Sequence, residues 1–296
     1  MKHSFPIVFA LLGLFFVAQF IGLFVLDNYV DQELTEKTGI VSYKALPGGI
    51  ERPDVEPNYA FLFITFAVIL GTSILLILIK FKKFKIWKAW YFLAVTLSLA
   101  VAWTVFIPQA IAWITALIAS LLKLFKPNFI VHNFTELFIY SGLAAIFVPI
   151  LNIFSAIILL LLISAYDMYA VWKSKHMVAM AKFQTSSNMF AGLTIPKSLS
   201  SITKITISKT KKTSSKKTSK EASVAILGGG DIAFPLLFAG TIMAQFGFQK
   251  AFVIPVFATL GLAILFALSK KGKFYPAMPF VSAGCFVGYG IILLIS

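Results

Sequence analysis

The chain is organised as long apolar runs separated by shorter polar segments. Each run holds about 17–25 residues, the length at which an α-helix crosses a hydrocarbon core of ~30 Å. Lipid offers no hydrogen-bond partners, so the backbone in such runs must satisfy itself as helix. The pattern therefore predicts an all-α membrane protein forming a single domain over residues 1–296. The nine expected transmembrane helices span residues 5–26, 59–80, 88–107, 108–125, 134–150, 151–172, 223–246, 250–269 and 275–295.

Two of these boundaries depend on short interruptions. Pro108 separates the third run from the fourth, and residues 149–152 separate the fifth from the sixth. Proline is tolerated in membrane helices, so each pair could be one kinked element. However, 88–125 and 134–172 are each far too long for one crossing, which favours a split in both. The first run is too long for a signal-peptide core and no small-residue cleavage site follows it, so we expect a retained anchor.

The composition agrees with a membrane setting. Apolar residues make up 59% of the chain, charged residues make up 12%, and the mean hydropathy is +0.91. A soluble domain would be about a quarter charged. The net charge of +15 would suit a nucleic-acid-binding protein, but Arg52 is the only arginine among 26 basic residues, and nearly all the lysines flank the apolar runs. We attribute the charge to contact with the lipid bilayer and expect no nucleic-acid partner.

Lysine placement predicts the orientation, because basic residues concentrate on the cytoplasmic side. With nine crossings and a cytoplasmic N-terminus, one side collects the lysines of 80–88, 123–126, 173–220 and 270–273. The opposite side receives segment 27–58, which carries seven acidic residues against three basic ones, and only Lys250 is misplaced. We therefore expect the C-terminus outside and residues 173–222 as a basic cytoplasmic loop.

Within that loop, residues 209–220 are a low-complexity Ser/Thr/Lys tract, for which we expect no fixed structure. Residues 201–207 are rich in β-branched side chains with interleaved polar ones, a pattern that favours a short strand. Such a strand could pair with an unwound substrate or lie as a patch on the lipid surface.

Two carboxylates, Asp167 and Asp231, are interpreted as the only acidic residues deep inside apolar runs. A carboxylate in hydrocarbon costs at least ~2.5 kcal/mol, so both are functional candidates. At ~1.5 Å per residue, Asp167 lies roughly 9 Å and Asp231 roughly 11 Å from the cytoplasmic ends of sequential, antiparallel helices. Two such carboxyls can share a proton and act as base and acid on a peptide bond. They would equally suit a cation or proton pathway, and the carboxylates alone leave both functions open.

The residues around the carboxylates favour proteolysis. Three glycines, 228–230, directly precede Asp231 and would give a substrate backbone and water room to approach, although glycines also serve helix packing. Pro235 predicts a kink four residues beyond Asp231. Pro276 and Pro279 open the last apolar run on the expected cytoplasmic side, where both aspartates lie.

Three motifs in order carry a resemblance to a known family. They are Tyr166-Asp167, Gly228-Gly229-Gly230-Asp231 and Pro276-Ala277-Met278. They resemble the Tyr-Asp, Gly-x-Gly-Asp and Pro-Ala-Leu signatures of the presenilin and signal peptide peptidase family, and the match is closest to archaeal members. The resemblance implies an aspartic-type intramembrane endopeptidase in an archaeal cell membrane. Its substrates would be transmembrane helices or remnant signal peptides, and it would need no cofactor and no metal.

The same resemblance assigns roles to individual residues. It implies Asp167 and Asp231 as the catalytic dyad. Active-site support is implied for Tyr166, Gly228 and Gly230, and substrate binding for Pro276, Ala277 and Met278. The family usually has Leu where this chain has Met278, and such swaps usually cost less than ~1.5 kcal/mol, so we expect function to be retained.

The sequence does not contain the residues that other classes of membrane protease need. A zinc protease needs His-Glu-x-x-His, and a membrane serine protease needs an intramembrane histidine base. The histidines, His3, His132 and His176, all lie at run edges, where we interpret them as interfacial residues. Prepilin peptidases share Gly-x-Gly-Asp but have fewer spans and no Pro-Ala-Leu motif, so they rank second among proteases. The single cysteine, Cys285, is interpreted as a packing residue.

Overall fold

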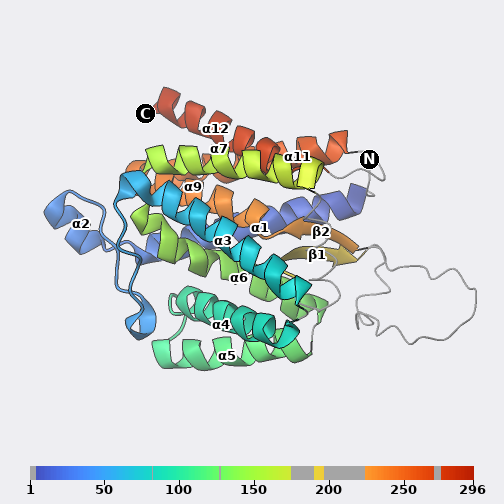
Figure 1. The fold of residues 1–296 in the computed structure, drawn as a ribbon. Coiled ribbons are helices and arrows are strands. Elements are labelled where there is room, and N and C mark those ends of the chain that lie inside the picture. The colour runs from blue at the N-terminus through green and yellow to red at the C-terminus, as the bar shows by residue number, and fades with distance from the viewer. Residues whose placement is uncertain (1–4, 82, 127, 175–189, 197–223, 270–274) are drawn as a thin grey trace, which may run out of the picture.

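The computed structural model describes residues 5–81, 83–126, 128–174, 190–196, 224–269 and 275–296. Its helices lie side by side in one bundle, with a small hairpin at one end (Figure 1). The main helices are α1 Phe5–Tyr29, α3 Ala60–Lys80, α4 Phe84–Trp103, α5 Gln109–Phe125, α6 Phe129–Phe147, α7 Ile153–Tyr169, α9 Gly230–Phe246, α11 Val253–Leu268 and α12 Met278–Ile295. The short elements are α2 Gln32–Thr38, α10 Phe248–Ala251, the 3₁₀ turns η1 Pro47–Gly49, η2 Pro57–Tyr59 and η3 Val148–Ile150, and the π-helical turn η4 Ala170–Ser174.

Seven of the described helices are long and apolar enough to cross a membrane, and α5 and α9 are shorter apolar helices of 17 residues each. These nine correspond in order to the nine expected runs. The start of α1 and the end of α12 lie at opposite ends of the bundle, as an odd number of crossings requires (Figure 1). The number of crossings and the orientation in the membrane stay predictions.

Asparagine caps explain two of the observed helix starts. Asn152 precedes α7 and accepts a hydrogen bond from the Ser155 N–H at 2.8 Å, which separates α7 from α6 as the split of 134–172 expects. Asn128 caps α6 through the Ile130 N–H at 3.1 Å. Because of this cap, α6 begins at Phe129, five residues before the expected start at 134.

The all-α class is confirmed, but the expectation for 223–246 was wrong in its first part, because the helical bundle carries one small hairpin. Val224–Gly228 form strand β2, which pairs antiparallel with strand β1, Gly192–Pro196, in a register that sets Gly192 opposite Gly228. Pairing supplies backbone hydrogen bonds that a helix would otherwise provide, so α9 starts only at Gly230. The strand expected over 201–207 lies outside the described residues.

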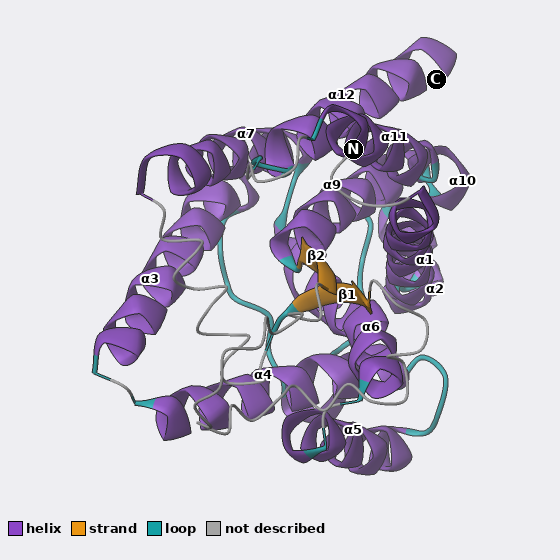
Figure 2. Ribbon diagram, turned by 90° about the vertical axis from the view of Figure 1, so that its right-hand side faces the viewer, coloured by secondary structure: helices purple, strands orange, loops and turns teal. Residues whose placement is uncertain are grey.

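Helix α9 forms the centre of the bundle. It contacts α1, α6, α7, α11 and α12, and viewed from the hairpin end these helices surround it (Figure 2). Most of its length is buried, including Ile232, Leu236 and Phe238, each with no more than 1% of its surface exposed. The hairpin lies over the end of α9 that begins with Gly230 (Figure 2).

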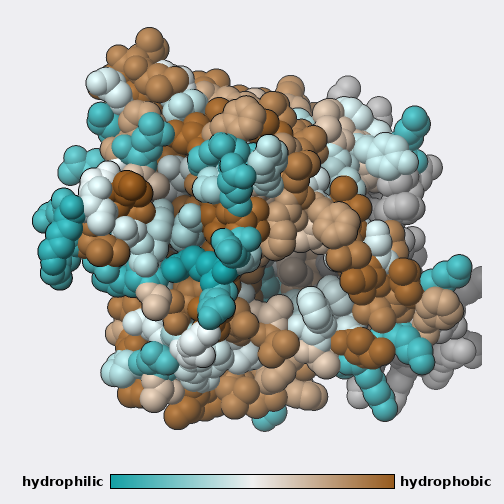
Figure 3. All heavy atoms as spheres, turned by 60° about the vertical axis from the view of Figure 1, so that its left-hand side comes forward, coloured by the Kyte–Doolittle hydropathy of each residue, from teal (hydrophilic) through white to brown (hydrophobic). Residues whose placement is uncertain are grey.

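The outer helix surfaces are apolar. Large hydrophobic side chains such as Phe66, Trp90 and Leu294 are more than half exposed. Figure 3 shows apolar residues over much of the helical surface, with hydrophilic residues gathered around α2 and the adjoining loops. A soluble protein rarely exposes so much contiguous apolar surface, so this face suits lipid.

Helices α11 and α12 pack in close backbone contact. A Cβ on Gly261 would overlap the Phe280 carbonyl, and one on Gly284 would overlap the Phe257 carbonyl. Small residues at such crossings let helix backbones approach closely in membranes. This packing fixes α12, whose first turn lies at the site described next.

Candidate active site

Asp167 lies in the last turn of α7, beside the start of α12. The Met278 N–H donates a hydrogen bond to Asp167 Oδ2 at 3.1 Å. Three residues earlier, the hydroxyl of Ser164 hydrogen-bonds that of Ser282 at 2.9 Å, which joins the same two helices. The first and third sequence motifs therefore meet, with the N-terminus of α12 directed at a carboxylate, the group that a helix N-terminus binds well.

Asp231 lies in the first turn of α9, near Asp167. Helix α9 packs against α7, which brings the two carboxyls within electrostatic range of each other, and both residues are half-buried. The expected depth of Asp231, roughly 11 Å into a helix, was wrong because β2 occupies the residues assigned to the first turns of that helix. The two aspartates nevertheless come together, at the end of the bundle that carries the hairpin.

The three glycines before Asp231 form a strand-to-helix junction and not a helix interior. Gly228 ends β2, Gly229 is a bend, and Gly230 begins α9. A Cβ on Gly228 would lie 3.2 Å from Asp231 Oδ2, and one on Gly229 would lie 2.6 Å from the Tyr140 hydroxyl. A Cβ on Gly230 would meet only Phe234 at 3.6 Å, an ordinary contact. Space is therefore restricted at the first two glycines and open at the third.

Helix α9 runs through Pro235, and a glutamine supports its first turn from α1. Proline has no N–H, so the Asp231 carbonyl lacks its usual donor four residues on. The next carbonyl, Ile232, accepts a hydrogen bond from Gln19 Nε2 at 2.8 Å. Gln19 is fully buried, and its Oε1 has no hydrogen-bond partner within the described residues. Sequence reasoning missed Gln19, although a lone amide in an apolar run was a visible signal.

The remaining expected site residues flank Asp167. Tyr166 precedes it on α7 and is half-buried, as is Ala277 at the cap of α12. Pro276 is buried, and the Met278 side chain is only 2% exposed. Met278 therefore reaches Asp167 through its backbone, while its side chain fills the interior.

A third acid, Glu136 on α6, is buried inside the bundle, so the interpretation of Asp167 and Asp231 as the only deep acids was wrong. Glu136 is 1% exposed and pairs with Lys123 of α5, whose Nζ lies 2.7 Å from Glu136 Oε1. Lys123 was expected to face the cytoplasm as a topology signal, but it is 3% exposed. The spacing of His132, Glu136 and Tyr140 at intervals of four on one helix face was the available signal.

Polar side chains of α6 bind the outer edge of β1. Glu136 Oε2 accepts a hydrogen bond from the Gly192 N–H at 2.9 Å, and His132 Nε2 bonds the Gly192 carbonyl at 2.8 Å. Asn133 bonds both the N–H and the carbonyl of Thr194, each at 3.0 Å. His132, expected at the interface, thus takes part in docking the hairpin.

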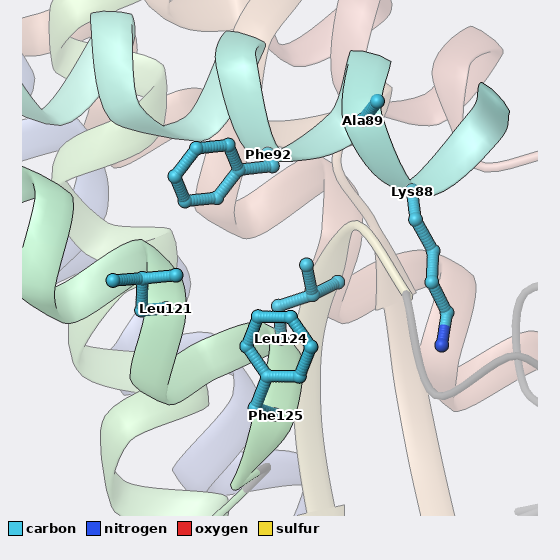
Figure 4. Close-up of a pocket in the computed structure, with 6 residues that line it drawn as sticks. All are labelled: Lys88, Ala89, Phe92, Leu121, Leu124 and Phe125. Carbon is cyan, nitrogen blue, oxygen red and sulfur yellow. The ribbon is translucent and has the colours of Figure 1, made fainter. Parts of the chain in front are cut away.

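A separate apolar groove of about 280 Å³ lies between α4 and α5, away from the aspartates. Phe92, Leu121, Leu124 and Phe125 line it, and Lys88 extends from its edge (Figure 4). It contains no acidic group. Among the described residues no cluster of three or more His, Cys, Asp or Glu side chains could hold a metal ion.

Comparisons with known proteins agree with this geometry. A family model described as "Signal-peptide peptidase, presenilin aspartyl protease" matches residues 21–296. A solved structure described as a presenilin family intramembrane aspartate protease in space group C222 superposes with a TM-score of 0.63 at 17% identity, covering 98% of this chain and 99% of that chain. Another, in space group P2, gives 0.59 at 17% identity with 97% of each chain covered. At this identity the structural likeness establishes the fold. No curated protein matches the chain.

Proposed function

Because the chain belongs to the signal-peptide peptidase and presenilin family of aspartyl proteases, we propose that Asp167 and Asp231 form the catalytic dyad of this intramembrane protease. We further propose that it cleaves peptide bonds within transmembrane helices of membrane proteins or remnant signal peptides. One observation carries the assignment: Asp167 and Asp231 lie on helices that pack against each other, α7 and α9, and the backbone of the third family motif donates a hydrogen bond to Asp167 through the Met278 N–H.

The dyad hydrolyses a peptide by general acid–base catalysis. The ionised carboxyl takes a proton from a water molecule, whose oxygen adds to the peptide carbonyl carbon. The protonated carboxyl donates its proton to the carbonyl oxygen, which gives a tetrahedral diol. Breakdown of the diol breaks the C–N bond, a proton passes to the departing amine, and a carboxylic acid and an amine result. The two carboxyls titrate as a unit, so the roles belong to the pair.

A helical substrate must unwind before it can be cut, because its backbone groups are bonded within the helix. The edge of β2 that faces away from β1 can form hydrogen bonds with the backbone N–H and C=O groups of the unwound substrate. Side chains of α6 cover the outer edge of β1, whereas in the part of the chain described here only β1 pairs with β2. Gly228 ends β2 and adjoins Asp231, so a segment paired along β2 would lead its carbonyl to the dyad.

The test uses purified protein in lipid vesicles with a single-span peptide substrate. Asp167→Asn and Asp231→Asn keep the carboxyl shape and remove its acid–base chemistry, so each should reduce cleavage by at least about a thousandfold. Asp54→Asn, at an exposed position, is the matched control and should cleave like the unmodified protein. Normal cleavage in either dyad variant contradicts the assignment. Ion flux without cleavage under any condition would favour the cation or proton pathway.

A further inference from the structure

The polar cluster around Glu136 connects directly to the segment that carries Asp231. We propose that Glu136, whose charge is paired with Lys123, is a latch: its Oε2 docks the hairpin on α6 and so positions Asp231. This inference rests on the proposed function, because it assigns Glu136 a positioning role for the dyad. Within the described residues, the side chain of Glu136 hydrogen-bonds Lys123, Tyr140 and Gly192, and it acts on the dyad only through them.

Both oxygens of Glu136 are used. Oε1 accepts from Lys123 Nζ at 2.7 Å, and Oε2 accepts from the Gly192 N–H at 2.9 Å and from the Tyr140 hydroxyl. Lys123 Nζ also donates to the Thr135 hydroxyl at 2.8 Å and lies 3.2 Å from His132 Nδ1. A buried ion pair is rarely a net source of stability compared with apolar residues of the same shape. The network is therefore better explained by what it holds in place.

The first route from Glu136 to the dyad runs through β1. Gly192 receives the Glu136 bond and stands opposite Gly228 in the sheet register. Directly beyond this pair, the Gly229 N–H donates to the Ala191 carbonyl at 3.2 Å. Gly192 also has a φ of +138°, and a Cβ there would overlap the Leu227 carbonyl, so only glycine fits this contact. Holding Gly192 therefore holds the strand end next to Asp231.

The second route runs through Tyr140. Its hydroxyl donates to Glu136, and the same hydroxyl lies only 2.6 Å from the position that a Cβ on Gly229 would take. The tyrosine thus supports the bend two residues before Asp231. Without Glu136 both supports would be lost together, while α7 and α12 at Asp167 would be unaffected. We therefore expect loss of Glu136 to displace Asp231 and to leave Asp167 in place.

Two double variants separate positioning from folding. Lys123→Met with Glu136→Gln and Lys123→Met with Glu136→Met both replace the ion pair with neutral side chains of similar length. The difference that matters here is the acceptor: glutamine keeps an oxygen that can accept from the Gly192 N–H, and methionine does not. Loss of an acceptor for a buried N–H is expected to raise amide exchange in residues 190–196 and 224–231 at least about tenfold in the methionine variant only.

The kinetic readout uses the vesicle cleavage assay. The glutamine variant should keep kcat within about threefold of the unmodified protein, and the methionine variant should lose at least about tenfold in kcat with a smaller change in KM, as expected for a misplaced catalytic group. Thermal unfolding of both variants gives the folded fraction. Equal amide exchange rates and equal kcat in the two variants would contradict the positioning role of Glu136. A kcat loss that disappears after correction for the folded fraction would contradict it as well. Amide exchange does not depend on proteolysis. It therefore tests whether Glu136 holds the hairpin on α6 even if the dyad variants disprove the proposed function.

Discussion

The Met278 N–H and the Asp167 carboxylate are joined by a hydrogen bond of 3.1 Å, although 111 residues separate them. The bond comes from the backbone and not from the side chain, at a position where the family usually has leucine. The side chain of Met278 points into the packed interior, where it is 2% exposed. Contact with Asp167 and filling of the interior are therefore separable properties of one residue.

Met278→Leu should keep activity within about threefold, since the N–H remains and a volume-conserving swap costs less than ~1.5 kcal/mol. Met278→Ala also keeps the N–H but leaves a cavity, which should lower the free energy of unfolding by ~2–5 kcal/mol. Thermal unfolding in detergent and cleavage rates at low temperature measure the two effects. A leucine variant that folds normally but is inactive would show that the side chain itself acts in catalysis.

An alanine scan of the three glycines should separate them sharply. Gly228→Ala crowds the Asp231 carboxylate and Gly229→Ala collides with the Tyr140 hydroxyl, so both should lose at least about tenfold in cleavage rate. Gly230→Ala has room and replaces a poor helix former at the start of α9, so it should stay within about threefold. Equal losses at all three positions would mean that the junction differs from the observed one.

Gln19→Met should destabilise the first turn of α9. The variant keeps the side-chain length but removes the hydrogen bond to the Ile232 carbonyl, and the net contribution of one such bond is ~0.5–1.5 kcal/mol. Thermal unfolding measures it, with Gln32→Met on the exposed face of α2 as the control. An unchanged melting temperature in Gln19→Met would show that the bond contributes nothing.

Tyr43 should make stability fall at alkaline pH. It lies in the loop after α2, outside the apolar helices, and burial raises the pKa of its hydroxyl to about 12. Since the folded pKa exceeds the unfolded value of about 10, the neutral phenol stabilises the fold below that pH, and this contribution is lost as pH rises towards the folded value.

Tyr43→Phe removes this dependence. The Tyr43 hydroxyl has no hydrogen-bond partner in the described part of the chain, so its removal should leave stability at neutral pH unchanged or up to ~1 kcal/mol higher. The Arg52 guanidinium, 5.8 Å from the ring centre, can stay over the phenyl ring. The melting temperature should fall more between pH 8 and pH 11 in the unmodified protein than in the variant. An equal fall in both proteins would contradict the role given to Tyr43.

Much of the helical architecture was readable because membrane insertion is a local property. Each apolar run must form its own backbone hydrogen bonds, so run length predicts which segments are helices. The structure then shows that asparagine caps at residues 128 and 152 fix where α6 and α7 begin. The aspartates were visible for the same reason, since a carboxylate in an apolar run is costly wherever it is found. The family motifs then singled out Asp167, Asp231 and the segment at Met278.

Only the tertiary structure decided the hairpin and the buried pair. Residues 224–228 are apolar and suit a helix or a strand equally. The choice depends on pairing with β1, which is distant in sequence: Gly228 pairs with Gly192. Lys123 in sequence is one more lysine at the end of an apolar run. Its burial against Glu136 follows from how α5 packs on α6, and side-chain pairing between helices leaves no mark in local hydropathy. Hydropathy determined which segments are helices, and packing determined which polar groups among them meet.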